Sequence, residues 1–200
     1  MKYLSIDIES TGLDKDCQII QFALVAFDAE KKEISEAIKK EYLIKCPSLE
    51  ELKNQVNPWV YTNMGDVINL AHQKGIPLGQ FKNELISYLK SAEVQNYFNH
   101  EKIVLFGKSL SAIDIPFLKR DLGWDTFSDV FMHRNLDLSC FCYSLIDLGL
   151  LTPEMGSGEK LMKFFNMGDV CHTAMDDAIN TIKLYFNLLD MCKERLQPLT

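Results

Sequence analysis

The first thirteen residues read MKYLSIDIESTGL (1–13) and place two acidic side chains inside an apolar run. The run from Tyr3 to Ile8 is typical of a strand, and because side chains alternate across a strand, Asp7 and Glu9 share one face. On an exposed strand such a pair would be ordinary solvated surface. The apolar neighbours instead favour a central, buried strand, where two carboxylates need protonation or cations to offset their desolvation. We therefore expect a divalent metal ion at Asp7 and Glu9.

The donor atoms of this acidic pair indicate the kind of metal. Carboxylate oxygens favour hard ions such as Mg²⁺ or Mn²⁺ over zinc. Two such ions, about 3.5 to 4 Å apart, activate a water and stabilise the leaving oxygen in phosphodiester cleavage, and they need several carboxylates that converge on one point. Asp7 and Glu9 supply only two, so further acids must come from elsewhere in the chain.

A second acidic cluster lies near the other end of the sequence, in the segment HTAMDDA (172–178), where a helix is predicted to begin. Asp177 stands between the small residues Ala174 and Ala178 and is expected to face the sheet. Asp176 points about 100° away, toward solvent, as a first-turn acid that the helix dipole stabilises. His172, just before the helix, would ordinarily be a cap or a surface residue, but its spacing to Asp177 also lets the imidazole swing over the acids.

The pattern of apolar residues predicts a strand meander followed by alternating helices and strands, which indicates an α/β protein with a mixed sheet. Asp114 opens one of the helices, with Pro116 in its first turn, where the missing amide donor costs little. The segment from Pro47 to Pro77 has weak periodicity, and its Trp59 and Tyr61 are expected to be buried. In chain order, the predicted elements are strands at 3–8, 19–27 and 34–45, a helix around 81–89, a strand at 103–106, a helix from 114 to near 123, a strand at 135–138, and helices at 139–148 and 173–194.

Composition indicates a single globular domain over residues 1–200, with 47% hydrophobic and 24% charged residues. The formal net charge of −7 argues against a protein that holds long duplexes through many phosphate contacts. A small nucleic-acid footprint stays compatible with it, because metal ions and local basic pairs supply positive charge. The first residues do not resemble a secretory signal and no apolar run approaches the roughly 20 residues of a membrane span. We expect a cytoplasmic protein that does not enter membranes.

The cysteines show no paired spacing of the CxxC kind, so we expect reduced thiols rather than disulfides or a structural zinc site. The six cysteines are Cys17, Cys46, Cys140, Cys142, Cys171 and Cys192.

Three segments, in their order along the chain, resemble the motifs of the DEDDh exonucleases, members of the DnaQ-like superfamily with the ribonuclease H-like fold. Residues 7–13, DIESTGL, resemble the first motif, DxExTGL. Residues 107–118, GKSLSAIDIPFL, resemble the second motif, in which an aspartate heads a helix. Residues 172–178 fit the third motif, HxAxxDA, which selects Asp177 over Asp176. The resemblance implies one exonuclease domain with a mixed β-sheet and flanking helices.

The resemblance also implies a role for each acid. Asp7, Glu9 and Asp177 would hold the metal that carries the attacking water, while Asp7 and Asp114 would hold a second one, both Mg²⁺ or Mn²⁺. His172 would be the general base, since its ordinary pKa of about 6.5 suits that role near neutral pH. The products would be nucleoside 5′-monophosphates released in the 3′-to-5′ direction.

Four further side chains are implied as contacts to the 3′-terminal nucleotide: Ser10, Thr11, Leu13 and Ser109. Leu13 has ordinary core packing as its alternative, and Phe22, Phe106 and Phe117 are expected in the core. Two positions depart from the family, with Ser109 where Asn is common and Ile113 where Phe is common. These departures bear on substrate positioning more than on metal binding.

The nature of the substrate and of any partner stays open at this stage. The segments 172–177 and 136–139 are similar to the oligoribonuclease branch, which trims very short RNA, but trimming of single-stranded DNA fits as well. A non-catalytic exonuclease-like module that binds nucleic acid is one alternative, and a proofreading subunit of a DNA polymerase is another. A homodimer and a polymerase partner are both compatible with the sequence.

Overall fold

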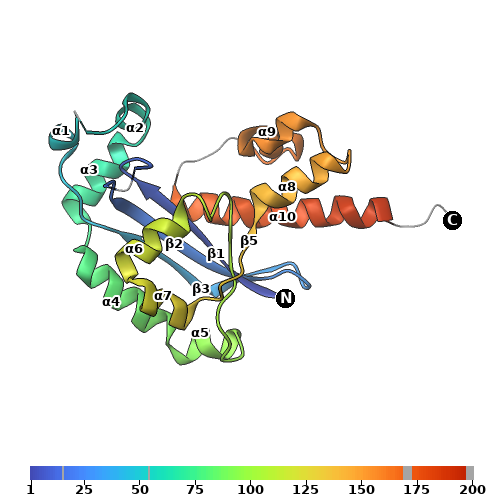
Figure 1. The fold of residues 1–200 in the computed structure, drawn as a ribbon, viewed down its shortest axis with the longest axis horizontal. Coiled ribbons are helices and arrows are strands. Elements are labelled where there is room, and N and C mark those ends of the chain that lie inside the picture. Colours follow the sequence, from blue (N-terminus) through green and yellow to red (C-terminus); the bar gives the residue numbers. More distant parts are fainter. Residues whose placement is uncertain (15, 54, 169–172, 197–200) are drawn as a thin grey trace.

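A computed structural model of the chain describes residues 1–14, 16–53, 55–168 and 173–196. Within them, a sheet of five strands has the order β3-β2-β1-β4-β5 (Figure 1). β1 pairs antiparallel with β2, and β2 pairs antiparallel with β3, whereas β1, β4 and β5 are parallel to one another. The strands are β1 (Lys2–Ser10), β2 (Ile19–Asp28), β3 (Glu33–Leu43), β4 (Leu105–Gly107) and β5 (Leu136–Asp137). This mixed sheet confirms the predicted α/β class.

Helices connect and cover these strands. The helices are α1 (Leu49–Leu52), α2 (Pro58–Asn63), α3 (Gly65–Lys74), α4 (Leu78–Leu89), α5 (Ala92–Tyr97), α6 (Asp114–Leu122), α7 (Trp124–Val130), α8 (Leu138–Asp147), the 3₁₀ turn η1 (Pro153–Gly156), α9 (Gly158–Phe164) and α10 (Ala174–Leu196). None of them combines, within the described residues, the length and apolar character that crossing a bilayer requires.

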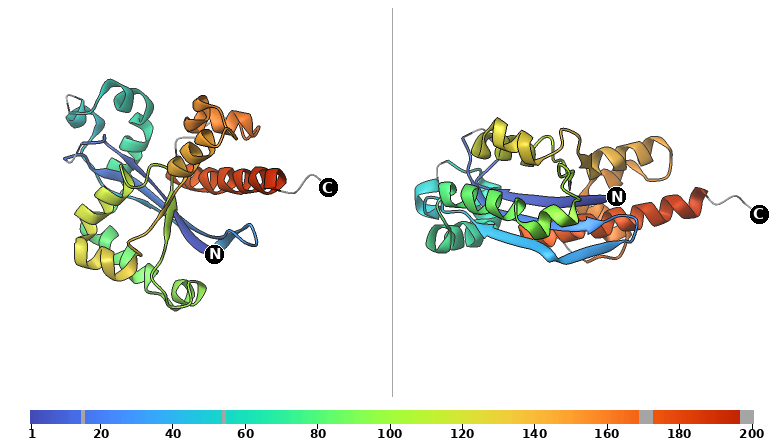
Figure 2. Two further views of the ribbon diagram at one scale, coloured as in Figure 1. Left: turned by 45° about the vertical axis from the view of Figure 1, so that its right-hand side comes forward. Right: turned by 90° about the horizontal axis from the view of Figure 1, so that it is seen from below.

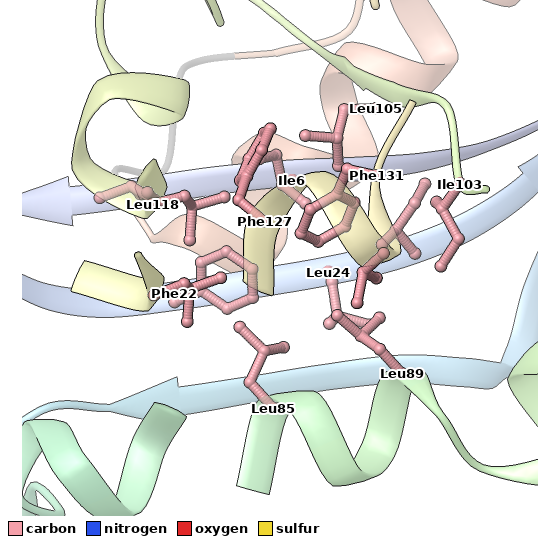
Figure 3. Close-up of a cluster of buried hydrophobic side chains, with 14 of the residues drawn as sticks. Ile6, Phe22, Leu24, Leu85, Leu89, Ile103, Leu105, Leu118, Phe127 and Phe131 are labelled. Carbon is pink, nitrogen blue, oxygen red and sulfur yellow. The ribbon is translucent and has the colours of Figure 1, made fainter. Parts of the chain in front are cut away.

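Alternating side chains of β1 and β2 build a separate core on each face of the sheet. On one face, Ile6 and Leu24 pack against α4, α6 and α7, as the side chains in Figure 3 show. On the other face, Val25 and Phe27 pack against α8, α9 and α10. α10 runs along the sheet and extends past it (Figure 2). Successive residues of β1 therefore point to opposite faces of the sheet. The odd-numbered residues, Asp7 and Glu9 among them, face α10.

The segment from Pro47 to Pro77, which the sequence leaves unassigned, forms the short helices α1, α2 and α3 around a third apolar cluster. Side-chain caps start the first two helices: Ser48 and Glu51 form a capping box on α1, and the Asn57 side chain accepts the Val60 amide on α2. The expected burial of Trp59 is wrong, since its side chain is 54% exposed. Because α2 uses Val60 as its buried residue, its neighbour Trp59 points outward.

Several predicted elements shift by a few residues. β3 starts at Glu33, the predicted strand 103–106 is β4 at Leu105–Gly107, and α8 starts directly after the two-residue β5. Gly123, with φ +84°, ends α6 near the predicted position. The three aromatic residues expected in the core, Phe22, Phe106 and Phe117, are buried. All described cysteines are free thiols, and Cys171 lies outside the described residues.

Candidate metal and nucleotide site

Three carboxylates converge at the carboxyl end of β1. Ligand oxygens of Asp7, Glu9 and Asp177 all lie within 4.8 Å of one another. The Ser5 hydroxyl, on the same face of β1, donates a buried hydrogen bond of 2.9 Å to the Ala178 carbonyl of α10. This bond fixes the first turn of α10 against β1 two residues before Asp7, and Asp177 thereby reaches the pair.

Side chains from the neighbouring strands cap the start of α10. Gln21 lies opposite Glu9 in the β1–β2 pairing, and its side-chain oxygen accepts the Ala174 amide at 3.1 Å. Its amide nitrogen donates to the Glu41 carboxylate at 2.8 Å, and that carboxylate also accepts the Met175 amide. The first amides of a helix have no partner inside it. Two of those in α10 thus donate to side chains of β2 and β3.

The two consecutive acids of α10 separate as helix geometry predicts. Asp176 is exposed and accepts the Thr173 hydroxyl at 2.7 Å, outside the acidic group. Asp177 is the member of the group. His172, the expected general base, lies outside the described residues.

Asp114 joins the site from the first turn of α6 and is only 4% exposed. Its carboxylate accepts the backbone amides of Ile8 and of Asp114 itself, which lower its pKa, but burial outweighs them and raises the pKa to about 7. The bond to Ile8 places Asp114 beside β1, beyond the point where β4 stops pairing at Phe106. Asp114 lies outside the group of three but close enough to Asp7 to raise its pKa.

Burial, together with repulsion between neighbouring acids, disfavours the ionised form of the carboxylates at this site. Burial raises the pKa of Asp7 well above its usual range, Asp114, Glu9 and Asp177 raise it further, and Lys108 lowers it. Burial, followed by the charge of Asp177, raises the pKa of Glu9 to about 7. Several partly buried carboxylates that repel one another offer the oxygen ligands that hard divalent cations prefer. The residues therefore fit the expected Mg²⁺ or Mn²⁺.

A pocket of about 380 Å³ opens next to Glu9. Leu13, which is 76% exposed, Trp59 and Ile113, just before α6, contribute apolar surface to its wall. The exposure of Leu13 disagrees with ordinary core packing. The sequence did not predict that Trp59 lines this pocket, although Asn57 and Pro58 before it are a recognisable signal for the start of a helix.

The other expected nucleotide contacts are held by bonds within the protein. The Ser10 hydroxyl donates to the Gly12 carbonyl at 2.6 Å, and the buried Thr11 hydroxyl accepts the Gln18 amide at 2.9 Å. Both shape the loop that carries Leu13 into the pocket. Direct contact of either with a nucleotide stays a prediction.

Ser109 has a left-handed backbone with φ +59°. Its amide donates to the Asp137 carboxylate at 2.9 Å, and its hydroxyl lies 3.0 Å from that of Ser139. Asp137, which was not among the predicted site residues, therefore holds the loop before Asp114 in place and also caps α8 through the Ser139 amide. A substrate contact of Ser109 stays a prediction.

Comparison of the whole fold with known structures shows where this arrangement of helices and strands recurs. The nuclease domain of 3′hExo, described as a DEDDh family member bound to rAMP, superimposes with a TM-score of 0.64 at 14% identity, over 94% of this chain and 92% of that one. The chain has the fold of a DEDDh exonuclease. E. coli exonuclease I bound to a dT13 oligonucleotide has a TM-score of 0.69 at 19% identity, over 98% of this chain. S. pombe Pop2p, with Mg²⁺ and Mn²⁺ bound, has a TM-score of 0.65 at 15% identity, over 93% of this chain and 82% of that one.

The likeness to DEDDh exonucleases lies in the structure and not in the overall sequence. No family model matches the chain, and no curated protein matches it by sequence. The chain spans 41% of the exonuclease I chain and 64% of another similar structure, cell-death related nuclease 4.

Proposed function

We propose that this protein is a metal-dependent 3′-to-5′ exonuclease that acts on single-stranded or short nucleic acid. The observation that carries the proposal is the convergence of Asp7, Glu9 and Asp177 within 4.8 Å beside a nucleotide-sized pocket, in a DEDDh exonuclease fold. The proposed unit is a single exonuclease domain spanning residues 1–200.

In this proposal, Asp7, Glu9 and Asp177 would hold one divalent ion, and Asp7 and Asp114 would hold a second. When bound, Mg²⁺ or Mn²⁺ supplies an activated water and stabilises the leaving oxygen. Asp114 is oriented by the Ile8 amide, and Asp177 by the capped start of α10. His172 takes the proton of the attacking water, a role that the third motif assigns to it.

The pocket beside Glu9 accommodates the terminal nucleotide. Its volume of about 380 Å³ suits one small ligand, and a base can stack or pack on the exposed Trp59 and Leu13. The structures of exonuclease I and 3′hExo hold an oligonucleotide and rAMP. The net charge of −7 favours short substrates over long duplexes.

The test is a product assay with 5′-labelled single-stranded DNA and RNA of several lengths, with Mg²⁺ or Mn²⁺. We expect stepwise shortening from the 3′ end with release of nucleoside 5′-monophosphates. Asp7→Asn should lower the rate by at least about a hundredfold, because it removes a charge shared by both metal sites. Asp176→Asn, at the exposed neighbour of Asp177, is the matched control and should stay active.

Wild-type protein that leaves every labelled substrate intact while binding it would refute catalysis and point instead to a non-catalytic binding module. Full activity of Asp7→Asn would place the active site elsewhere.

A further inference from the structure

Lys108 is an exposed cation next to the acidic site, and the proposed mechanism does not use it. It follows β4 directly, and β4 runs parallel to β1 with Ser5 beside Phe106. Gly107 keeps this register, since a Cβ at that position would lie 2.9 Å from the Ile6 carbonyl oxygen. Continued by two residues beyond Ser5 and Phe106, the register sets Lys108 level with Asp7.

The side chain of Lys108 leans toward α9. A Cβ placed on Gly158 would lie 3.0 Å from the Lys108 ammonium nitrogen and 3.1 Å from its Cε. Because Gly158 has no side chain, the end of the Lys108 side chain fits beside it. Within the described residues, no carboxylate lies within ion-pair distance of this ammonium, although its charge lowers the pKa of Asp7.

Lys108 and the nucleotide pocket lie on different sides of the carboxylates. The pocket is formed by Glu9 to Leu13, Trp59 and Ile113, and Lys108 is not part of its wall. Figure 1 shows α1 to α3 on one side of the carboxyl end of β1 and α8 and α9 on the other. In the proposed function, a strand with its last nucleotide in the pocket and its last phosphodiester at the carboxylates passes from the pocket side to the side of α8 and α9, where Lys108 lies.

The negative charges of the carboxylates and of a bound substrate favour a further cation beside the site. A single-stranded substrate brings one negative charge per nucleotide into a region already crowded with carboxylates. Bound metal ions offset the charge at the phosphodiester that is cleaved but not that of the next one along the strand. A lysine ammonium is a compact point charge that binds phosphate oxygens strongly.

On the basis of the proposed function, we propose that Lys108 binds the phosphodiester on the 5′ side of the one that is cleaved. The ligand is a non-bridging phosphate oxygen, recognised by its charge and without regard to base or sugar. Lys108 would then favour substrates that extend at least one charged linkage beyond the scissile bond.

The test pairs a protein variant with a substrate variant. Wild type and Lys108→Met are compared on a single-stranded octanucleotide and on the same octanucleotide with an uncharged methylphosphonate at the linkage 5′ of the scissile one, at saturating Mn²⁺. We expect each change alone to lower kcat/KM by roughly tenfold or more, as loss of a charge-assisted contact does. Both together should lower it little further, because they remove the same contact. Lys108→Arg should retain most of the activity.

Lys193→Met, which removes an equal charge at the far end of α10, is the matched control and should respond to the methylphosphonate as wild type does. Losses that multiply in the combined experiment would overturn the contact, as would full activity of Lys108→Met on the natural octanucleotide. Wild type that fails to shorten the natural octanucleotide would instead overturn the proposed exonuclease function.

Discussion

Replacement of Glu9 by glutamine should stabilise the metal-free protein at high pH. The pKa of Glu9 is raised from its ordinary value of 4.5 to about 7 by burial and by Asp177. The folded chain therefore holds a proton that the unfolded chain has already released, so the folded state loses stability as the pH rises from 4.5 to about 7. At about 1.4 kcal/mol for each pH unit, full ionisation of Glu9 costs the fold about 3 kcal/mol.

The measurement is the free energy of unfolding by urea, in EDTA, at pH 4 and pH 8. We expect Glu9→Gln to come close to wild type at pH 4, where Glu9 is mostly protonated in both the folded and the unfolded chain. At pH 8 it should be more stable by about 3 kcal/mol. With saturating Mn²⁺ the order should reverse, because wild type gains stability from an ion that the variant binds less tightly. Glu101→Gln, at an exposed glutamate near the opposite end of β4, should change neither value.

A variant that is no more stable than wild type at pH 8 would refute the reasoning. So would a gain of equal size at pH 4 and pH 8, since it would not arise from ionisation.

Two further changes test the support of the site and the wall of its pocket. Gln21→Leu removes the acceptor of the Ala174 amide and the donor to Glu41; it should lower the free energy of unfolding by about 1 to 3 kcal/mol and weaken Mn²⁺ binding in a calorimetric titration. Unchanged Mn²⁺ affinity would show that this cap does not position Asp177. Trp59→Ala should raise KM at least several-fold in the oligonucleotide assay while kcat changes little, because Trp59 lies in the pocket wall and outside the group of carboxylates. A fall in kcat at constant KM would assign Trp59 a role other than holding the nucleotide.

Local periodicity was sufficient to predict the parts of the fold and site that depend on it. Alternation along β1 put Asp7 and Glu9 on one face, and helix geometry separated Asp177 from Asp176, as the structure confirms. The prediction that Asp114 begins a helix is also confirmed.

The parts that the sequence did not predict depend on contacts between distant residues. The α10 cap joins Gln21 to Ala174, which are 153 residues apart, and no local pattern announces such a bond. Asp137 supports the loop of Ser109 across 28 residues. Trp59 was misassigned because large apolar side chains are usually buried, whereas the short α2 has room for only one buried residue, Val60.

The bond between Ser5 and Ala178 joins residues that are 173 positions apart. A growing polypeptide therefore cannot assemble the group of Asp7, Glu9 and Asp177 until the start of α10 has left the ribosome. Before that point, β1 carries two acids without the third carboxylate of the group. Assembly of the acidic group thus follows synthesis of α10, and fragments cut short anywhere before α10 would lack its third carboxylate.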